Sequence, residues 1–395
     1  MQVLVLNSGS SSLKFQLFSM PNETILCSGQ IERIGFNDAF FKFKTEKDTI
    51  ELESQILNHR VALKLVAKHL LDKNHGVIKS ADDIKVVGHR VVHGGSTFSN
   101  TTIITKAVKD KIKVLCDLAP LHNPANLEGI EVAETIFENA IQVAVFDTAF
   151  HQTIPEHAYK YAIPNEFLTE NNIRVYGFHG TSHKYVTEKA IAFLGKKESK
   201  IVTIHLGNGC SMTAVKNGKS MDHSLGFSPV TGLIMGTRSG DIDPSIIFHL
   251  KDKLGYKLKD INTLLNKKSG MFGLTGYSDL RDIETMAERG NKDCQLALQM
   301  NAYRIKKYIG SYAAILNGLD AIVFTAGIGE NSDVIRRLVC EDMDFLGIKL
   351  DEEKNTIRSK EIRAINTNDS PVKILVIPTN EELEIVKQAM TLVED

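Results

Sequence analysis

The stretch that decides the fold is residues 201–215, IVTIHLGNGCSMTAV. Four residues of strand character lead into His205, the chain then reads LGNG (206–209), and a second apolar run follows. This order of strand, glycine turn and strand is typical of a β-hairpin. Glycines also let backbone N–H groups approach an anion closely. A single turn of this kind is compatible both with an ordinary hairpin and with a phosphate-binding one.

The N-terminal stretch 3–17, VLVLNSGSSSLKFQL, has the same order of strand, polar turn and strand. Aligning the two stretches places Asn7 on His205 and matches the apolar residues on both sides. The serine hydroxyls around Gly9 and the following Lys14 suit phosphate oxygens, although a serine-rich turn with a solvated lysine has the same composition. Two copies of one phosphate-binding hairpin predict two related halves that face a single ligand.

The composition is that of a globular protein with enough chain for a large core. The chain has 395 residues, which favours two or three domains, and 43% of them are apolar and 24% charged. A formal net charge of −1 argues against a nucleic-acid-binding surface. The five scattered cysteines lack CxxC spacing, so we expect reduced thiols in a cytoplasmic protein. We expect neither a signal peptide nor a membrane span, because the N-terminus begins a strand and no apolar run is long enough.

The segment GHRVVHGG (88–95) follows a short buried strand. An arginine beside a glycine pair at a strand end, as Arg90 is, suits two-point binding of a carboxylate or a phosphoryl group. His89 and His93 are compatible with metal binding. A hydrogen-bonded structural role is favoured for both, because no Glu or Cys completes a set of metal ligands.

Two further residues follow predicted strands. Asp147 comes directly after the strand 142–146, where open α/β sheets bind ligands and where aspartates also cap turns. His179 is expected between a strand at 175–178 and the N-terminus of a helix, where N–H groups attract anions. A histidine that only caps the helix is the alternative for this position.

Residues 222–244, DHSLGFSPVTGLIMGTRSGDIDP, contain four glycines at a spacing that suits neither a helix nor a strand. Such a loop, carrying Arg238, is typical of an active site. In GYSDLRD (276–282), Ser278 is predicted to cap a helix, which places Arg281 in the first turn against the helix dipole. Contact with a nucleotide base or ribose would explain that position.

Residues 325–331, TAGIGEN, are expected to form a glycine turn between a strand and a helix that begins near Ser332, a second nucleotide-binding turn. Glu381 opens the last helix, where an acidic residue is expected on dipole grounds; from this segment alone metal binding is the less favoured interpretation. No GxxxxGK[ST] or GxGxxG occurs, so neither the P-loop nor the dinucleotide-binding fingerprint applies.

Taken in order, these segments resemble the acetokinase (acetate kinase) family over essentially the whole chain. The matching motifs are NSGSSSLKF (7–15), GHRVVHGG (88–95), APLHNPAN (119–126), FDTAFH (146–151), GFHGTSH (177–183), HLGNGCS (205–211), GTRSGDIDP (236–244), FTAGIGEN (324–331) and IPTNEEL (377–383). One such motif would be a weak signal, but the whole series in the family's order is highly specific.

The resemblance implies the fold shared by acetate and sugar kinases, actin and heat-shock chaperone ATPases. In that α/β fold, two duplicated ribonuclease-H-like domains close on a central nucleotide cleft. We assign residues 1–150 plus 382–395 to the N-terminal domain and residues 151–381 to the C-terminal domain, which carries the nucleotide-binding segments. The implied reaction is the reversible transfer of the γ-phosphoryl group of ATP to acetate, giving acetyl phosphate and ADP. The implied cofactor is Mg²⁺, or Mn²⁺ in its place, and the implied assembly is a homodimer.

The resemblance also assigns roles to individual residues. Arg90 and Arg238 would hold the acyl carboxylate and the transferring phosphoryl group, and His179 would contact its equatorial oxygens. Asp147 matches a position described as a proton donor or acceptor; because acetate is already ionised at neutral pH, we expect it to orient Arg90 or a metal-bound water instead. The metal ligands would be Asn7 and Glu381. The ATP-binding residues would be Lys14, His205, Leu206, Gly207, Asn208, Gly209, Asp279, Leu280, Arg281, Gly327, Ile328, Gly329, Glu330 and Asn331. The substrate-binding residues would be Arg90, Val92, Leu121, Phe178 and Pro229, the last four forming the apolar pocket for the acyl methyl group.

Three interpretations remain open. Val92 follows the acetate pattern, whereas propionate kinases tend to have a smaller residue there, so a propionate or other short-chain carboxylate kinase is the alternative within the family. A sugar kinase of the same fold would need a base for a hydroxyl group, which Asp147 could supply, but it would leave the two arginines unexplained. A nucleotide-gated filament or chaperone module would hydrolyse ATP independently of small carboxylates.

Overall fold

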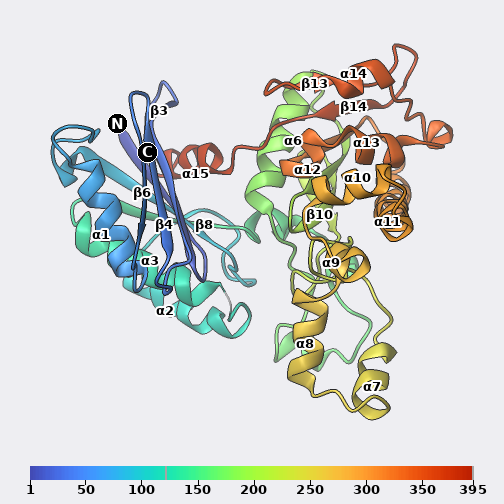
Figure 1. The fold of residues 1–395 in the computed structure, drawn as a ribbon, viewed down its shortest axis with the longest axis horizontal. Coiled ribbons are helices and arrows are strands. Elements are labelled where there is room, and N and C mark those ends of the chain that lie inside the picture. Colours follow the sequence, from blue (N-terminus) through green and yellow to red (C-terminus); the bar gives the residue numbers. More distant parts are fainter. Residues whose placement is uncertain (121, 394–395) are drawn as a thin grey trace. The chain divides into compact units, whose positions relative to one another are not determined.

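The computed structural model describes residues 1–120 and 122–393, which divide into two compact units (Figure 1). Unit 1 comprises Met1–Ala149 and the C-terminal segment from Asn380, and unit 2 comprises Phe150–Thr379. The predicted domain boundaries stay predictions, because contacts within a chain do not establish independent folding. Of the helices in the described chain, none has both the length and the apolar composition that spanning a bilayer requires.

An eight-stranded mixed sheet forms the body of unit 1. Its strands are β1 (Gln2–Ser8), β2 (Ser12–Ser19), β3 (Thr24–Glu32), β4 (Ala39–Thr45), β5 (Thr49–Ser54), β6 (Ile84–Val91), β7 (Thr102–Ile103) and β8 (Ile141–Phe146). Their order is β5-β4-β3-β2-β1-β6-β8-β7. The helices are α1 (His59–Leu70), α2 (Lys106–Val114), α3 (Asn123–Ile136) and α15 (Glu381–Met390), with short 3₁₀ turns η1 (Ala81–Asp83) and η2 (Leu115–Asp117).

Helices cover both faces of this sheet, which is why residues 3–6 of β1 are buried on both sides. Leu4 and Leu6 pack in one core cluster with residues of α1 and α3. On the other side α15 lies against β1, β6 and β8 (Figure 1). A Cβ added to Gly88 of β6 would be 2.7 Å from Ile385 of α15, so the helix packs directly on the strand there. This packing brings Glu381, the first residue of α15, to the sheet.

Unit 2 is built on a six-stranded mixed sheet. Its strands are β9 (Lys200–Leu206), β10 (Cys210–Lys216), β11 (Lys219–His223), β12 (Ala321–Thr325), β13 (Arg363–Ala364) and β14 (Lys373–Val376), in the order β11-β10-β9-β12-β14-β13. The helices are α4 (Glu156–Tyr159), α5 (Glu166–Thr169), α6 (Gly180–Leu194), α7 (Ser245–Asp252), α8 (Leu258–Lys267), α9 (Gly270–Thr275), α10 (Leu280–Glu288), α11 (Lys292–Leu316), α12 (Ala326–Asn331), α13 (Asp333–Cys340) and α14 (Glu352–Thr356), with 3₁₀ turns η3 (Ala149–Thr153) and η4 (Asp344–Leu346). Helix α6 packs against β9 and β12, and α11 against β9 and β10.

The two units repeat one arrangement of strands. In unit 1, β1 pairs antiparallel with β2 and parallel with β6, which pairs parallel with β8. In unit 2, β9 pairs antiparallel with β10 and parallel with β12, which pairs parallel with β14. Turns 9–11 and 207–209 link the corresponding hairpin strands, so Asn7 and His205 occupy equivalent positions. This topology confirms the predicted duplicated α/β fold and both of its hairpins.

The strand predicted at 175–178 is wrong. This segment has no regular structure: the Val175 N–H donates to the Tyr159 carbonyl at 2.8 Å, and the Tyr176 N–H donates to the Gly226 carbonyl at 3.1 Å. Gly177 then takes a positive φ of 74°. Its apolar residues gave it strand character in the sequence, but they are buried between loops and not in a sheet.

Candidate active site

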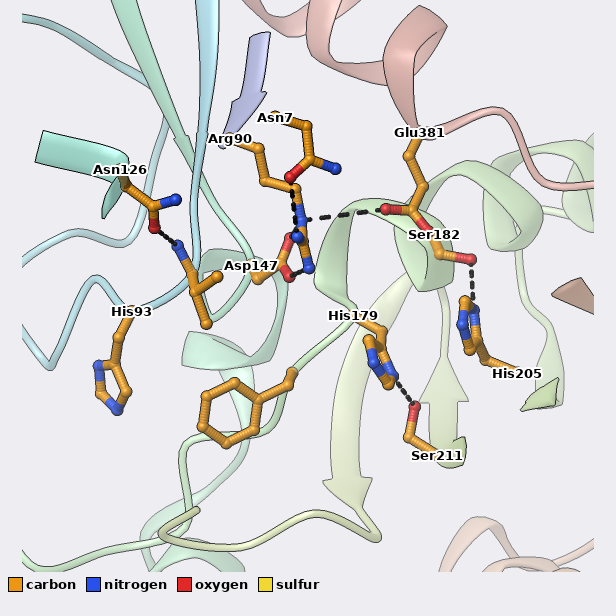
Figure 2. Close-up of polar contacts among 12 residues, drawn as sticks. Asn7, Arg90, His93, Asn126, Asp147, His179, Ser182, His205, Ser211 and Glu381 are labelled. Atoms are coloured by element: carbon orange, nitrogen blue, oxygen red, sulfur yellow. Dashed lines mark hydrogen bonds and ion pairs between the residues drawn. The ribbon is translucent and has the colours of Figure 1, made fainter. Parts of the chain in front are cut away.

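A buried ion pair links the ends of two parallel strands in unit 1. Arg90 lies near the end of β6 and Asp147 directly after β8, and the pairing of these strands brings them together. The Arg90 guanidinium donates from Nε to Oδ1 of Asp147 at 3.1 Å and from Nη2 to Oδ2 (Figure 2). The Asp147 side chain is only 1% exposed, so the arginine supplies the hydrogen bonds that water would otherwise make.

Asn7 and Glu381 approach the same guanidinium. Oδ1 of Asn7 accepts from Arg90 Nη1 at 3.1 Å, and Oε2 of Glu381 lies 4.0 Å from Arg90 Nε (Figure 2). Burial raises the pKa of Glu381 to about 7; Arg90 opposes this shift and Asp147 adds to it. Burial alone would lower the pKa of Arg90, but the two carboxylates raise it above its ordinary value. The four side chains therefore form one electrostatic cluster.

The oxygen atoms of Asn7 and Glu381 fit a magnesium ion. Mg²⁺ prefers oxygen ligands, and proteins usually bind it through one or two side chains together with substrate phosphates. An amide oxygen and a carboxylate that both border Arg90 match that set of donors. Within residues 1–120 and 122–393, no group of three or more His, Cys, Asp or Glu side chains could hold a metal ion. The residues present therefore suit an ion whose coordination is completed by substrate and water.

Two buried asparagines of α3 fix the backbone that follows β6. Oδ1 of Asn126 accepts from the Val92 N–H at 3.0 Å (Figure 2), and its Nδ2 donates to the Ser8 carbonyl at 2.6 Å. Asn123 makes the corresponding pair of hydrogen bonds to the N–H and the carbonyl of His93. Sequence reasoning missed this role, because contacts to backbone atoms leave no pattern of partner side chains in the sequence.

His89 and His93 make hydrogen bonds inside unit 1. Nε2 of His89 lies 2.8 Å from Oε1 of Gln142, and Nδ1 of His93 accepts from the Gly95 N–H at 3.0 Å. Burial lowers the pKa of both histidines to about 4, so both rings are neutral at physiological pH. These contacts match the structural role and not the metal-binding one.

In unit 2, His179 is the N-cap residue of α6, with a left-handed backbone (φ 57°). Its Nδ1 lies 2.9 Å from Oγ of Ser211 in β10, and its ring stacks on that of His205 with the centroids 4.4 Å apart (Figure 2). Nδ1 of His205 in turn lies 2.8 Å from Oγ of Ser182. The hairpin β9–β10 and the start of α6 thus hold the His179 ring in one orientation.

Arg238 is a half-buried cation on the glycine-rich loop before α7. Its Nη1 donates to the Pro229 carbonyl at 2.9 Å, a partner that does not neutralise the charge, and burial lowers its pKa. Asp241 anchors the loop by accepting from the Gly232 N–H and from the Tyr308 hydroxyl, each at 2.7 Å. A positioned guanidinium of this kind is suited to bind an anionic group.

A cavity of about 700 Å³ in unit 2 brings most of the predicted ATP-binding residues together. Its volume is typical of small-molecule sites. The predicted residues that line it are Gly207, Asn208, Asp279, Leu280, Arg281, Gly327, Ile328 and Asn331. Four further residues line the cavity but were not among the predicted ATP-binding residues: Ser278, Glu284, Ser332 and Arg358. Four parts of the chain, 207–208, 278–284, 327–332 and Arg358, therefore line one cavity.

Asp279, and not Ser278, caps α10. The Asp279 carboxylate accepts from the Arg281 N–H at 2.9 Å and from Arg281 Nε at 3.0 Å. These hydrogen bonds lower the pKa of Asp279 to about 2. The ion pair also accounts for an arginine in the first turn, because its charge is offset by the residue that caps the helix. Contact between Arg281 and a nucleotide stays a prediction.

The glycine turn predicted at 325–331 is mostly a short helix, α12, which begins directly after β12. The Gly329 carbonyl accepts from Nη1 of the buried Arg336 at 2.9 Å. Oε1 of Glu330 accepts from the Thr379 N–H at 3.1 Å. Gly329 and Glu330 thus support the segment, whereas Gly327, Ile328 and Asn331 line the cavity.

The other predicted ATP-binding residues lie away from the cavity lining. Leu206 is a core residue of β9, 1% exposed. Gly209 lies beside His179, since an added Cβ would be 3.3 Å from the His179 Nε2 atom. Lys14, in unit 1, lines a separate hollow of about 440 Å³ that also includes Glu382. A role of these residues in nucleotide binding stays a prediction.

The residues predicted to form the acyl pocket belong to different units. Val92 belongs to unit 1 and is 8% exposed, whereas Phe178, 3% exposed, and Pro229 belong to unit 2. Leu121 lies outside the described residues. The acyl pocket therefore stays a prediction.

Comparison with known sequences identifies close relatives along the full chain. A family model described as the acetokinase family matches residues 2–387. The acetate kinase of Flavobacterium johnsoniae is 65% identical over 395 residues, which cover 100% of both chains. The acetate kinase of Carboxydothermus hydrogenoformans is 52% identical over 396 residues, which cover 100% of this chain and 99% of that one.

Solved structures agree with the sequence relatives. The crystal structure of Porphyromonas gingivalis acetate kinase matches with a TM-score of 0.95 and 45% identity over 99% of each chain. A propionate kinase from Francisella tularensis subsp. tularensis matches with a TM-score of 0.92 and 42% identity, also over 99% of each chain. These matches confirm both the resemblance and the fold predicted from the motifs. The chain therefore belongs to the acetokinase family.

Proposed function

We propose that this protein catalyses the reversible transfer of the γ-phosphoryl group of ATP to acetate, giving acetyl phosphate and ADP. As a member of the acetokinase family, it is a kinase that transfers phosphate to a carboxylate. The relatives that match most of the chain include acetate kinases and one propionate kinase. A propionate or other short-chain carboxylate kinase is therefore the alternative.

The observation that carries the proposal is the pairing of Asp147 with Arg90. A kinase that phosphorylates a hydroxyl group needs a base, and Asp147 was the candidate. Both of its oxygens accept hydrogen bonds from one guanidinium, so the carboxylate is directed at Arg90 and not at the proton of an acceptor hydroxyl. A carboxylate acceptor needs no base, because it is already ionised at neutral pH. The site therefore favours an acid over an alcohol as substrate.

The proposed roles follow from the charge of each side chain. A carboxylate oxygen of acetate attacks the γ-phosphorus, the new oxygen–phosphorus bond forms as the bond to the β-phosphate oxygen breaks, and ADP leaves. Arg90 and Arg238 bind the acetate carboxylate and the transferring phosphoryl group. His179 donates to its equatorial oxygens. Positioning and charge stabilisation of this kind account for most of the rate in phosphoryl transfer.

Mg²⁺, or Mn²⁺ in its place, is the proposed cofactor. Asn7 and Glu381 would hold the ion, and its chemistry is to neutralise charge on the phosphate oxygens. The cavity in unit 2 is the proposed site for the adenosine part of ATP, with Asp279 to Arg281 and the residues 327–331 beside it. Lys14 is proposed to bind the nucleotide phosphates.

The test is an assay in which hydroxylamine traps any acyl phosphate. The protein is incubated with ATP, Mg²⁺ and one acceptor at a time: acetate, propionate, butyrate or glucose. We expect hydroxamate from acetate at the highest kcat/KM and from propionate at a lower one, because one methylene changes discrimination by about 1–3 kcal/mol. Preference for propionate would support the alternative. ATP consumption without hydroxamate from any acid would contradict the proposal.

Gly209→Ala is expected to lower kcat about tenfold, because small displacements of catalytic groups reduce phosphoryl transfer. The new Cβ would be 3.3 Å from the His179 Nε2 atom, so this ring would have to shift, whereas Nη1 of Arg238 at 3.7 Å would be in ordinary contact. Gly310→Ala is the control, since no atom lies within 4 Å of a Cβ there. Both variants are compared by kcat and by thermal unfolding; an unchanged kcat for Gly209→Ala would contradict the role given to His179.

We also propose that the protein is a homodimer in the cytoplasm. The five cysteines are unpaired and four of them are buried, which suits a reducing compartment. Large apolar side chains are exposed on α7, α8, α9, α11 and the loops that adjoin them, and we propose that they form the interface, because exposed apolar patches mark protein interfaces. We call this set the apolar surface: Ile246, Phe248, Leu254, Tyr256, Leu258, Phe272, Leu274, Tyr277, Leu296, Met300 and Tyr303.

Phe248→Asp is expected to convert the dimer into a monomer. Phe248 is 63% exposed on the apolar surface, and a charge buried there in an interface would be desolvated without a partner. Phe345→Asp is the control, because Phe345 is 75% exposed but lies on η4, outside the apolar surface. Size-exclusion chromatography with light scattering gives the mass of each; dimeric Phe248→Asp protein would place the interface elsewhere.

A further inference from the structure

We propose that His151 and His223 are positioning residues that hold the backbone of Phe178 from both sides and thereby orient Phe178 and His179 for the reaction. This inference rests on the proposed function, because it is there that Phe178 and His179 meet the acyl group and the phosphoryl group. Neither His151 nor His223 is among the residues assigned so far to catalysis or binding. Both belong to unit 2 and both are buried.

The two rings bind opposite groups of one residue. The Phe178 N–H donates to Nε2 of His223 at 3.1 Å, and Nε2 of His151 lies 3.0 Å from the Phe178 carbonyl oxygen. A backbone N–H can only donate, so Nε2 of His223 must be unprotonated. A carbonyl can only accept, so Nε2 of His151 must carry a proton. The two histidines are therefore required to be opposite tautomers.

The second nitrogen of each ring has a hydroxyl partner that suits its tautomer. Nδ1 of His151 lies 3.0 Å from Oγ of Ser220, a hydroxyl that is able to donate to it. Nδ1 of His223 lies 2.8 Å from Oγ1 of Thr213, which accepts from it. Burial, followed by the neighbouring histidines, lowers the pKa of His223 well below its ordinary value and keeps that ring neutral. Each tautomer is thus fixed at both ends of its ring.

The backbone held in this way is not supported by a sheet. Gly177 (φ 74°) and His179 (φ 57°) are both in the left-handed region, on either side of Phe178. A Cβ added to Gly177 would be 2.7 Å from Cγ of His151 and 3.0 Å from Cδ2 of His223. The two rings, whose centroids are 4.1 Å apart, therefore close directly on this glycine and leave no room for a side chain.

The consequence reaches two side chains of the proposed site. The direction of the Phe178 side chain and the start of α6 at His179 both follow from the backbone that the two rings hold. On its other side the His179 ring is fixed through Nδ1 by Ser211. Loss of the hydrogen bond from His151 or His223 to the Phe178 backbone should therefore disturb acyl binding and phosphoryl transfer. The nucleotide cavity is built from other segments and should be unaffected.

The test compares two substitutions at each position. Glutamine can replace the Nε2 contact, since its amide both donates to a carbonyl and accepts from an N–H, whereas leucine cannot. We expect His151→Leu and His223→Leu to lower kcat for acetate about 10- to 100-fold, as losses of supporting hydrogen bonds do. They should also change the ratio of propionate to acetate turnover, with KM for ATP unchanged. The Gln variants should recover most of the rate. His157→Leu, at an exposed position, is the control.

Folded Leu variants with wild-type kcat and selectivity would overturn the proposal, and so would Gln variants as impaired as the Leu variants. NMR of histidine-labelled wild-type protein gives a second measurement that depends on neither activity nor variants. We expect the ring proton of His151 on Nε2 and that of His223 on Nδ1. The opposite tautomer at either position would overturn the proposal. If the wild-type protein formed no acyl phosphate, the proposed function would fail. The tautomers would still decide whether His151 and His223 hold the Phe178 backbone as proposed.

Discussion

Arg238→Ala is expected to lower kcat for acetyl phosphate formation by about 10³-fold or more, the effect of removing an arginine that stabilises a transferring phosphoryl group. The guanidinium is half-buried on its loop, and it donates to neutral groups, the Pro229 carbonyl at 2.9 Å and the Met235 sulfur at 3.9 Å. Its charge is therefore available to an anion. Arg238→Lys should restore little activity, because an ammonium group cannot reproduce two-point binding by a planar guanidinium.

A control variant separates the loss of a catalytic group from the structural effect of removing an arginine. Arg174 is 8% exposed in the same unit, and its guanidinium lies 3.6 Å from the centre of the Tyr159 ring. Arg174→Ala should reduce the thermal unfolding temperature but leave kcat near that of the wild type. Kinetics and circular dichroism on both variants check the comparison. Wild-type rates from folded Arg238→Ala protein would refute the role given to Arg238.

Arg90→Ala is expected to abolish measurable turnover and to destabilise the fold. The loss of rate should again be about 10³-fold or more, for the same electrostatic reason. The free energy of unfolding should fall by about 3 kcal/mol, because removing one partner of a buried ion pair leaves the other charge uncompensated. That charge is Asp147, whose side chain is 1% exposed. Steady-state kinetics and urea unfolding measure the two effects.

Asp147→Asn distinguishes a positioning residue from a base. The amide keeps the shape of the side chain, and its oxygen can still accept from Arg90 Nε, so we expect a loss of only about 10- to 100-fold. If Asp147 were instead the base that activates the acceptor, the Asp147→Asn variant would lose almost all of its activity. The double variant Arg90→Ala, Asp147→Asn should regain stability over Arg90→Ala alone, with no gain in activity, because the uncompensated charge is gone. Equal stabilities would mean that the pair does not act through charge.

The hairpins and the duplication could be predicted from the sequence because their signals are local. In 3–17 and 201–215 the apolar residues, the turn and the returning strand are adjacent in the chain. The order β2-β1-β6-β8 and its counterpart β10-β9-β12-β14 were not predicted, because β1 and β9 pair with strands far along the chain. Residues 175–178 had the same local signal but no neighbouring strand, so tertiary context overrode it.

The pairing of Arg90 with Asp147 could not be predicted from either motif alone. Each residue was a candidate at a strand end, but their contact depends on the parallel register of β6 and β8, where Arg90 is opposite Val145. The register of one strand on another is set by packing across the whole sheet. Residues that act on backbone atoms were harder still. Asn126 and His223 bind a neighbouring N–H, and neither contact leaves a recognisable spacing in the sequence.

The most direct test of the account is the origin of the bridging oxygen in the product. The protein is incubated with ATP, Mg²⁺ and acetate labelled with ¹⁸O in both carboxylate oxygens, and the phosphorus products are followed by ³¹P NMR. Attack by the carboxylate predicts acetyl phosphate whose phosphorus carries ¹⁸O from acetate. Inorganic phosphate as the only product, without the label and formed at the same rate in the absence of acetate, would contradict the account.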